Sequence, residues 1–474
     1  MNYESVIGLE VHCELATNTK IFCGCKNEFG SPVNANVCPV CAGMPGALPV
    51  LNKKVVDYAI KAGLALNCSI TAYGNSDRKH YFYPDLPSSY QISQLDRPLC
   101  GPGYVDIEVN GQPRRIGITR IHIEADAGKL SHEQGAFSGV DLNRSNVPLI
   151  EIVTEPDLRN AEETVIFLDT VRNILKYCGV SDCKMQEGSL RCDVNLSLRP
   201  VGQEKFGTRT EMKNINSFKA VQRGIEYEAV RQAEVLDNGG QVIQETRKWD
   251  DNKGSNSSLR GKEDAHDYRY FPDPDLAPIV ITEEHVARIR ADLPELPKAK
   301  TARFMEQYGL PDYDANMLSA SNGLANFFET AAQCGNAKAA ANWLMGDIMK
   351  LMNAKELEMD EIPFKAEYLG QLIDLIDKGT ISGTIAKKVL PMMFDEDKSP
   401  GELVKEHNLV QISDEGAIKD VIVKVLEENP QSVADFKAGK KQAAGFLMGQ
   451  SMKALKGQGN PQIVNKIIQE LLEV

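Results

Sequence analysis

Apolar and polar residues alternate along several short stretches in the first 300 residues of the chain. In RIHIEADAG, Ile121 and Ile123 point to one side of a predicted strand, and His122, Glu124 and Asp126 point to the other. A period of two is typical of a strand with one buried face. The polar face of this strand therefore combines an imidazole with two carboxylates.

The same arrangement recurs in other predicted strands. Their polar faces carry Glu10, His12 and Glu14 in VIGLEVHCEL, Glu151 in PLIEIVTE, Arg191 and Asp193 in SLRCDVNLSLRP, and Glu211 and Lys213 in TEMKNINSF. Carboxylates that lie so near one another raise each other's pKa unless a cation compensates for their charge. Mg²⁺ is such a cation, since it prefers carboxylate and water oxygens as ligands. A solvated acidic face explains one such strand well but explains several poorly. We therefore predict a cation-assisted site on one face of an antiparallel sheet.

Helical patterns separate these strands and then replace them. Helices are predicted at 52–67, 160–179 and 217–240, which gives the first part of the chain an α+β layout. Strand patterns end near Leu293, and helical periodicity continues from there. The predicted division is a catalytic α+β domain at 1–292, an all-α helical domain at 293–405 and a small all-α helical tail at 406–474.

Composition narrows the possible classes of protein. The 474 residues, 42% of them hydrophobic and 25% charged, are typical of a globular protein with two to four domains. No apolar run approaches the roughly 20 residues of a membrane span, and MNYESVIGLEVH does not resemble a signal peptide. We therefore expect a cytoplasmic protein.

Charge is distributed unevenly along the chain. The net charge of −13 argues against nonspecific nucleic-acid binding by the whole surface, yet the stretch from Phe436 to Gln469 contains no acidic residue. Its lysines include Lys440, Lys441, Lys453 and Lys456. This basic stretch is a candidate RNA contact, although a solubilising lysine face explains the charge equally well.

Two further motifs suggest ligands. Cys23, Cys25, Cys38 and Cys41 form two close pairs, which match a tetrahedral zinc site better than four unrelated buried thiols. Four thiolates leave no open position, so such a zinc would be structural. The segment 77–94, DRKHYFYPDLPSSYQISQ, mixes basic and aromatic residues, which suits a nucleotide or an RNA end, although packed aromatic loops are as common.

The chain closely resembles the B-subunit family of tRNA-dependent amidotransferases over essentially its full length. The motifs that carry the resemblance are VIGLEVHCEL, DRKHYFYPDLP, YQISQ, RIHIEADAGK, VDLNRSNVPLIEIVTEPD, EGSLRCDVNLSLRP, EMKNINSF, DYRYFPDPDL, NWLMGD and GFLMGQSMKALKGQGNP. The resemblance implies conversion of Glu-tRNA(Gln), and of Asp-tRNA(Asn), to the amidated forms. It also implies a catalytic fold like that of glutamine synthetase, ATP and Mg²⁺ as cofactors, and a glutaminase A subunit and a small C subunit as partners.

The resemblance also implies roles for individual residues. Glu10, His12, Glu124 and Glu151 are the implied metal or ATP ligands, with Asp193 and Glu211 as further candidates. Arg191 and Lys213 would neutralise transferred phosphate, and Lys79 and Tyr81 would contact the nucleotide. Members of the family commonly carry two successive glutamates where this sequence has Glu124-Ala125. The metal shell would then be supported differently, by Asp126 or by water.

Two other functions remain open at this point. One is an RNA-binding or assembly scaffold without catalysis, and the other is a self-contained ATP-dependent ligase that uses free ammonia. The absence of a GxxxxGK[ST] loop argues against a P-loop kinase. Hydrolysis of ATP only in the presence of misacylated tRNA would separate these alternatives.

Overall fold

The computed structural model describes residues 2–135, 137–261, 267–357, 361–412, 414–437, 440 and 442–472. The chain divides into two compact units, Met1–Leu296 and Pro297–Val474. Each is described by itself.

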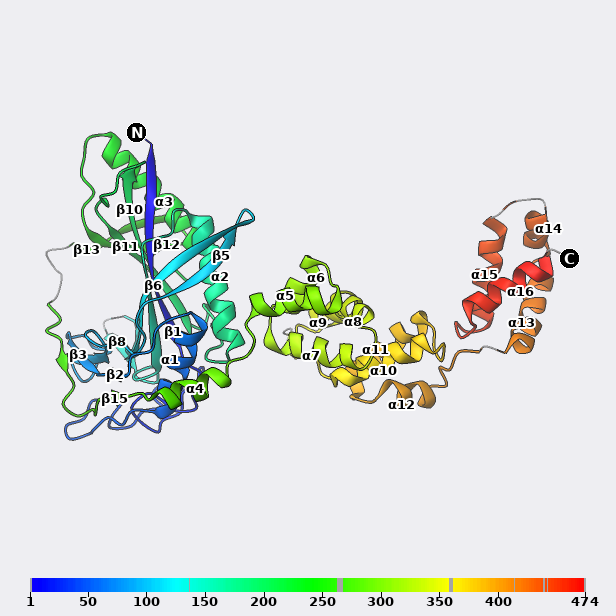
Figure 1. Ribbon diagram of the computed structural model, residues 1–474, viewed down its shortest axis with the longest axis horizontal. Helices are drawn as coiled ribbons and strands as arrows, with labels where there is room; N and C mark the ends of the chain where they lie inside the picture. Colours follow the sequence, from blue (N-terminus) through cyan, green and yellow to red (C-terminus); the bar gives the residue numbers. More distant parts are fainter. Residues whose placement is uncertain are drawn as a thin grey trace. The chain divides into compact units, whose positions relative to one another are not determined.

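The first unit is built on an eight-stranded sheet with the N-terminal strand in its middle (Figure 1). The strands lie in the order β13 (Ser255–Gly261), β12 (Glu245–Asp250), β11 (Thr210–Lys213), β10 (Leu190–Pro200), β1 (Tyr3–Glu14), β9 (Pro148–Thr154), β6 (Gln112–Ala125) and β5 (Gly103–Val109). Neighbouring strands are antiparallel except for β11 and β12, which are parallel. The exception arises because the helix α3 (Phe218–Asp237) connects these two strands and returns the chain to the same end of the sheet.

Three helices pack against this sheet and bury its apolar face. The helix α1 (Lys53–Ala65) contacts β6, α2 (Ala161–Tyr177) contacts β5, and α3 contacts β10. All three correspond to helices predicted from the sequence. The alternating strand β1 contributes Leu9, Val11 and Cys13 to the core, while Glu10 and His12 on its other face stay partly exposed. The predicted α+β class is confirmed for this unit.

Short strands and a further helix complete the first unit. They are β2 (Tyr73–Gly74), β3 (Asp77–His80), β4 (Tyr90–Ser93), β7 (Lys129–Gln134), β8 (Phe137–Asp141), β14 (Phe271–Pro272), β15 (Ile279–Val280) and α4 (Glu283–Ala291). The strands β14, β3 and β4 form a small sheet, and β4 contacts the long strand β6. This contact brings the aromatic and basic segment 77–94 to the end of β6.

The second unit has helices and no named strand among its described residues. Its helices are α5 (Pro297–Tyr308), α6 (Asp312–Leu318), α7 (Asn322–Gln333), α8 (Ala337–Trp343), the π-helix η2 (Leu344–Ile348), α9 (Met349–Ala354), α10 (Ala366–Asp377), α11 (Gly383–Glu396), α12 (Pro400–Glu406), α13 (Glu415–Glu428), α14 (Pro430–Lys437), α15 (Gln442–Ala454) and α16 (Pro461–Leu472). The last four helices share a core that includes Ile418, Leu447 and Ile468. The further division at 405/406 stays a prediction. Within the described residues, we find no helix with the length and apolar character needed to span a membrane.

Candidate active site

The polar side chains predicted from the strand patterns lie on five neighbouring strands of the large sheet. The strand order β11-β10-β1-β9-β6 places them in one continuous row. The register puts Glu10 opposite Asp193, and it puts His12 opposite Glu151. Because side chains two residues apart share a face, each strand can present a pair of polar groups to the same side.

One compact group in this row is formed by His12, Glu124 and Glu151, whose potential ligand atoms lie within 4.8 Å of one another. The His12 Nε2 atom is 3.4 Å from Glu151 Oε2 and 3.8 Å from Glu124 Oε1. Burial alone would raise the pKa of both carboxyls, but the neighbouring imidazoles of His122 and His12 lower it below the ordinary value. One imidazole and two ionised carboxylates are a suitable donor set for a divalent cation.

His122 joins this group, although neither the strand patterns nor the family resemblance assigned it a role as a ligand. Its Nε2 atom lies 3.3 Å from Glu151 Oε2 and 3.8 Å from Glu124 Oε2. Burial alone would lower the pKa of His122, but Glu124 and Glu151 raise it to about 9. The signal was available in the sequence, since His122 lies two residues before Glu124 and therefore shares its face.

Glu10 belongs to a second compact group rather than to the first. Its carboxylate lies with those of Asp193 and Glu211, again within 4.8 Å. Burial, Glu151 and Glu211 raise the pKa of Glu10. The Lys213 Nζ atom lies 2.6 Å from Asp193 Oδ2 and 3.0 Å from Glu211 Oε1, so an ammonium neutralises part of this group's charge. Of the four implied metal or ATP ligands, Glu10 therefore lies in this second group, and His12, Glu124 and Glu151 lie in the first.

Arg191 lies beside the row and binds Asp126 through an Nη2 to Oδ2 hydrogen bond of 2.9 Å. Asp126 also accepts a hydrogen bond of 2.5 Å from Arg144 Nε, and Arg144 reaches Glu14 Oε1 at 2.9 Å. These two arginines lower the pKa of Asp126 against the effect of its burial. Asp126 is therefore engaged by arginines and does not lie in either acidic group. Ala125 packs in the apolar core, on the opposite side of β6 from Glu124.

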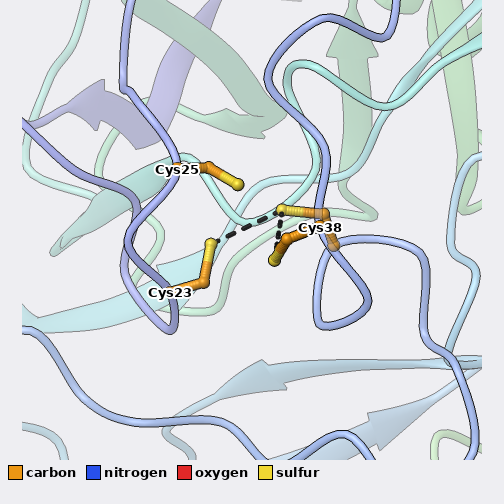
Figure 2. A group of neighbouring side chains, drawn as sticks. Cys23, Cys25 and Cys38 are labelled. Atoms are coloured by element: carbon orange, nitrogen blue, oxygen red, sulfur yellow. Dashed lines mark hydrogen bonds between the residues drawn. The ribbon is translucent and has the colours of Figure 1, made fainter.

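The four predicted zinc ligands lie together in the first unit. Figure 2 shows Cys23, Cys25 and Cys38 brought together from two parts of one loop. All four sulfurs lie within 4.8 Å, with Cys23–Cys41 at 3.5 Å and Cys38–Cys41 at 3.9 Å. A tetrahedron with zinc–sulfur bonds of about 2.3 Å has sulfur–sulfur edges of about 3.8 Å, so this cluster has the right size for zinc.

A fully buried lysine supports the cysteine cluster. The Lys20 Nζ atom donates to Asn36 O at 2.8 Å and to Leu142 O at 3.2 Å, and it lies 3.3 Å from Cys41 Sγ. The hydrogen bond from Cys23 and the Lys20 ammonium lower the pKa of Cys41, which favours a thiolate. The turn that contains Leu142 also carries Arg144. The cysteine cluster is therefore linked, through Lys20 and this turn, to the arginines beside the acidic row.

The predicted nucleotide contacts lie close to the first acidic group. The Lys79 Nζ atom lies 5.9 Å from the ring centroid of Tyr81 and 4.9 Å from that of Tyr268. Burial would lower the pKa of Lys79, but Glu124 and other neighbours raise it above its usual value. Lys79 therefore remains a cation beside Glu124, which suits contact with phosphate.

The predicted tRNA-binding lysines lie in the second unit, except that Lys441 falls outside the described residues. Lys440, Lys453 and Lys456 are exposed. Lys440 pairs with Asp435 at 3.1 Å, which reduces its contribution to a basic surface. Lys453 and Lys456 are therefore the described lysines best placed to test the predicted RNA contact.

Comparison with known proteins defines the class to which this site belongs. Residues 5–287 match the GatB/GatE catalytic domain, and residues 326–472 match the GatB domain. The chain belongs to the GatB family.

Particular relatives match it from end to end. The chain is 59% identical to the B subunit of the aspartyl/glutamyl-tRNA(Asn/Gln) amidotransferase from Caldicellulosiruptor saccharolyticus (strain ATCC 43494 / DSM 8903 / Tp8T 6331) over 478 residues, covering all of both chains. It is 56% identical to the protein of that name from Carboxydothermus hydrogenoformans (strain ATCC BAA-161 / DSM 6008 / Z-2901), and 54% identical to that from Lachnoclostridium phytofermentans (strain ATCC 700394 / DSM 18823 / ISDg). Each of these two alignments covers 99% of both chains. The family resemblance inferred from the motifs is confirmed.

Proposed function

We propose that this chain is the subunit of a tRNA-dependent amidotransferase that converts Glu-tRNA(Gln) to Gln-tRNA(Gln), and Asp-tRNA(Asn) to Asn-tRNA(Asn). The observation that carries this proposal is the row of imidazoles and carboxylates on five adjacent strands, in a chain whose relatives bear that name. An acid-lined, mainly antiparallel sheet is also what we expect of a catalytic fold like that of glutamine synthetase. We propose this fold for residues 1–292, followed by the helical domain at 293–405 and the tail at 406–474.

The chemistry requires activation of a carboxylate, because a carboxylate and ammonia form a salt rather than an amide at neutral pH. In the first step, an oxygen of the side-chain carboxylate bonds to the γ-phosphorus of ATP. The bond from that phosphorus to the β-phosphate oxygen breaks, and ADP leaves. Ammonia then attacks the carbonyl carbon of the acyl phosphate. Its carbon–oxygen bond to phosphate breaks, and inorganic phosphate and a proton are released.

Each of the two acidic groups would bind one cation. His12, Glu124 and Glu151 would hold one Mg²⁺, and Glu10, Asp193 and Glu211 would hold another. When bound, Mg²⁺ neutralises charge on the phosphates, which is the main requirement of phosphoryl transfer. Lys213 lies beside Asp193 and Glu211, and Arg191 lies next to the row, paired with Asp126. Both are cations that would approach the transferred phosphate, and Lys79 with Tyr81 would contact ATP.

The rest of the proposed assembly follows from the family. Zinc would occupy the four-cysteine cluster and stabilise its loop. A glutaminase A subunit would supply ammonia, and a small C subunit would bind both. Transfer RNA would contact the basic lysines of the tail, namely Lys440, Lys441, Lys453 and Lys456, and the complex would work in the cytoplasm.

The test is a transamidation assay on the chain purified with its A and C partners. It contains Glu-tRNA(Gln), ATP, Mg²⁺ and ammonium chloride, with the glutaminase inactivated. We expect amide formation, its loss in Glu10→Ala and Glu151→Ala, and its retention in the control Glu108→Ala, which removes an exposed carboxylate from the edge strand β5.

Three results would contradict the proposal. Normal activity in Glu10→Ala or Glu151→Ala would remove that residue from the site. No conversion from ammonium, with tRNA still bound, would favour the scaffold. Hydrolysis of ATP without tRNA would favour the self-contained ligase.

A further inference from the structure

Two consecutive aromatic side chains, Phe82 and Tyr83, lie on the surface of the loop that connects β3 to β4. Phe82 is 77% exposed and Tyr83 is 58% exposed. Large aromatic rings usually contribute their area to a core or an interface, so two adjacent exposed rings indicate a contact with another molecule. We call Phe82 and Tyr83 the exposed aromatic pair.

The connected strands are fixed beside the first acidic group. On β4, Gln91 Nε2 donates to Ala125 O at 2.7 Å, and Ser93 Oγ donates to Glu124 Oε2 at 3.3 Å. Glu124 is one of the proposed cation ligands. The loop that carries the exposed aromatic pair therefore begins and ends on strands whose position is tied to the reaction site.

The residues around this loop combine rings with cations. Tyr81, immediately before the pair, lies edge-on to Tyr268 with 6.1 Å between the ring centroids, and Tyr268 has the same relation to Tyr270. Lys79 lies over Tyr268, and the exposed Arg269 lies between the two tyrosines in sequence. Rings provide stacking surfaces for unpaired bases, and cations neutralise the backbone phosphates.

We propose that the exposed aromatic pair stacks the unpaired 3′-terminal nucleotides of the tRNA and thereby delivers the esterified amino acid to the first acidic group. This inference rests on the proposed function and adds the site at which the RNA end is bound. An RNA end fits better than the adenine of ATP because Lys79 and Tyr81 are already the proposed contacts of the nucleotide, which leaves the exposed aromatic pair that follows them in the loop for a second group.

The experiment uses the assembled complex and a tRNA with 2-aminopurine in place of its 3′-terminal adenine, because stacking quenches the fluorescence of that base. We expect quenching on binding to the natural complex and loss of quenching in Phe82→Ala/Tyr83→Ala. The KM for acylated tRNA should rise roughly 5- to 150-fold, as expected for one stacked base, and the KM for ATP should not change. Tyr83→Phe should retain the quenching, since it keeps the ring.

The matched control is Phe29→Ala, which removes a ring that is 72% exposed in the cysteine-containing loop, and it should change neither value. Unchanged quenching in Phe82→Ala/Tyr83→Ala would overturn the inference. A rise in the KM for ATP alone would assign the pair to the nucleotide, and loss of the partner subunits on size-exclusion chromatography would assign it to a protein interface. Quenching is read without turnover, so its loss in the variant supports the inference even if amide formation fails in the natural complex.

Discussion

Replacing Lys20 with methionine tests how the cysteine cluster is held. The ammonium of Lys20 is fully buried, and it contacts Asn36 O, Leu142 O and Cys41 Sγ. Methionine keeps much of the volume but removes every donor. The change leaves Asn36 O without this donor, whereas Leu142 O still accepts from Ser145 N at 3.1 Å. One unpaired carbonyl costs about 1–3 kcal/mol, so we expect Lys20→Met to lose that much stability.

The same change should weaken zinc binding. The thiolate of Cys41 loses a cation at 3.3 Å that partly balances the charge of four sulfurs around the metal. Loss of such an outer partner typically lowers metal affinity 10- to 100-fold, which corresponds to about 1.4–2.7 kcal/mol. The measurement is release of zinc from the purified complex to a coloured chelator, together with zinc content by elemental analysis.

Two further variants make this measurement decisive. Lys26→Met is the control, because Lys26 lies in the same loop with its side chain exposed and forms a surface ion pair with Glu28 at 3.8 Å. Lys20→Gln retains hydrogen-bond donors without the charge, and it should release zinc at an intermediate rate. If folded Lys20→Met or Lys20→Gln releases zinc as slowly as the natural chain, the reasoning about this lysine is refuted.

Three other outcomes can be checked with single measurements. Lys453→Gln/Lys456→Gln should weaken tRNA binding and reduce the slope of log affinity against log salt by about 2, and an unchanged slope would exclude both lysines from the interface. His122 has a raised pKa, so in metal-free protein its charge stabilises the fold fully below pH 6.5 and ceases to do so as pH rises through about 9. In urea titrations, the natural chain should therefore lose roughly 3 kcal/mol of unfolding free energy between pH 6.5 and about 9, and His122→Gln should not show this loss. A difference in unfolding free energy between the two proteins that does not change with pH would contradict this. Glu228 is fully buried and pairs with Arg231 at 2.6 Å, so Glu228→Ala should lower the unfolding free energy in urea by roughly 3–5 kcal/mol. A decrease below about 1 kcal/mol would refute the inference that this buried ion pair stabilises the fold.

The strands, helices and polar faces were predictable because each depends on local periodicity. The alternation in VIGLEVHCEL was enough to place Glu10 and His12 on one face of a strand. Their assignment to different acidic groups was not predictable, because it depends on which strands lie on each side of β1. That order is β10 on one side and β9 on the other, and it is fixed by packing between distant segments.

Irregular segments provided the least information. Arg144 lies in a turn without periodicity, yet it joins Glu14 to Asp126 beside the row. The parallel pairing of β11 with β12 was also missed, because a strand pattern shows which face is buried but not the direction of its neighbour. In both cases the deciding information lies in tertiary contacts.

The central position of β1 has a consequence for how the chain is made. Tyr3 pairs with Pro200 and His12 pairs with Glu151, so this strand is synthesised long before its partners. Contacts of such long sequence separation form slowly, and an unpaired strand with an apolar face is prone to aggregate while it waits. The first acidic group cannot assemble before β9 has been made, and the second cannot assemble before β11, so a growing chain lacks part of the row until those strands have been synthesised.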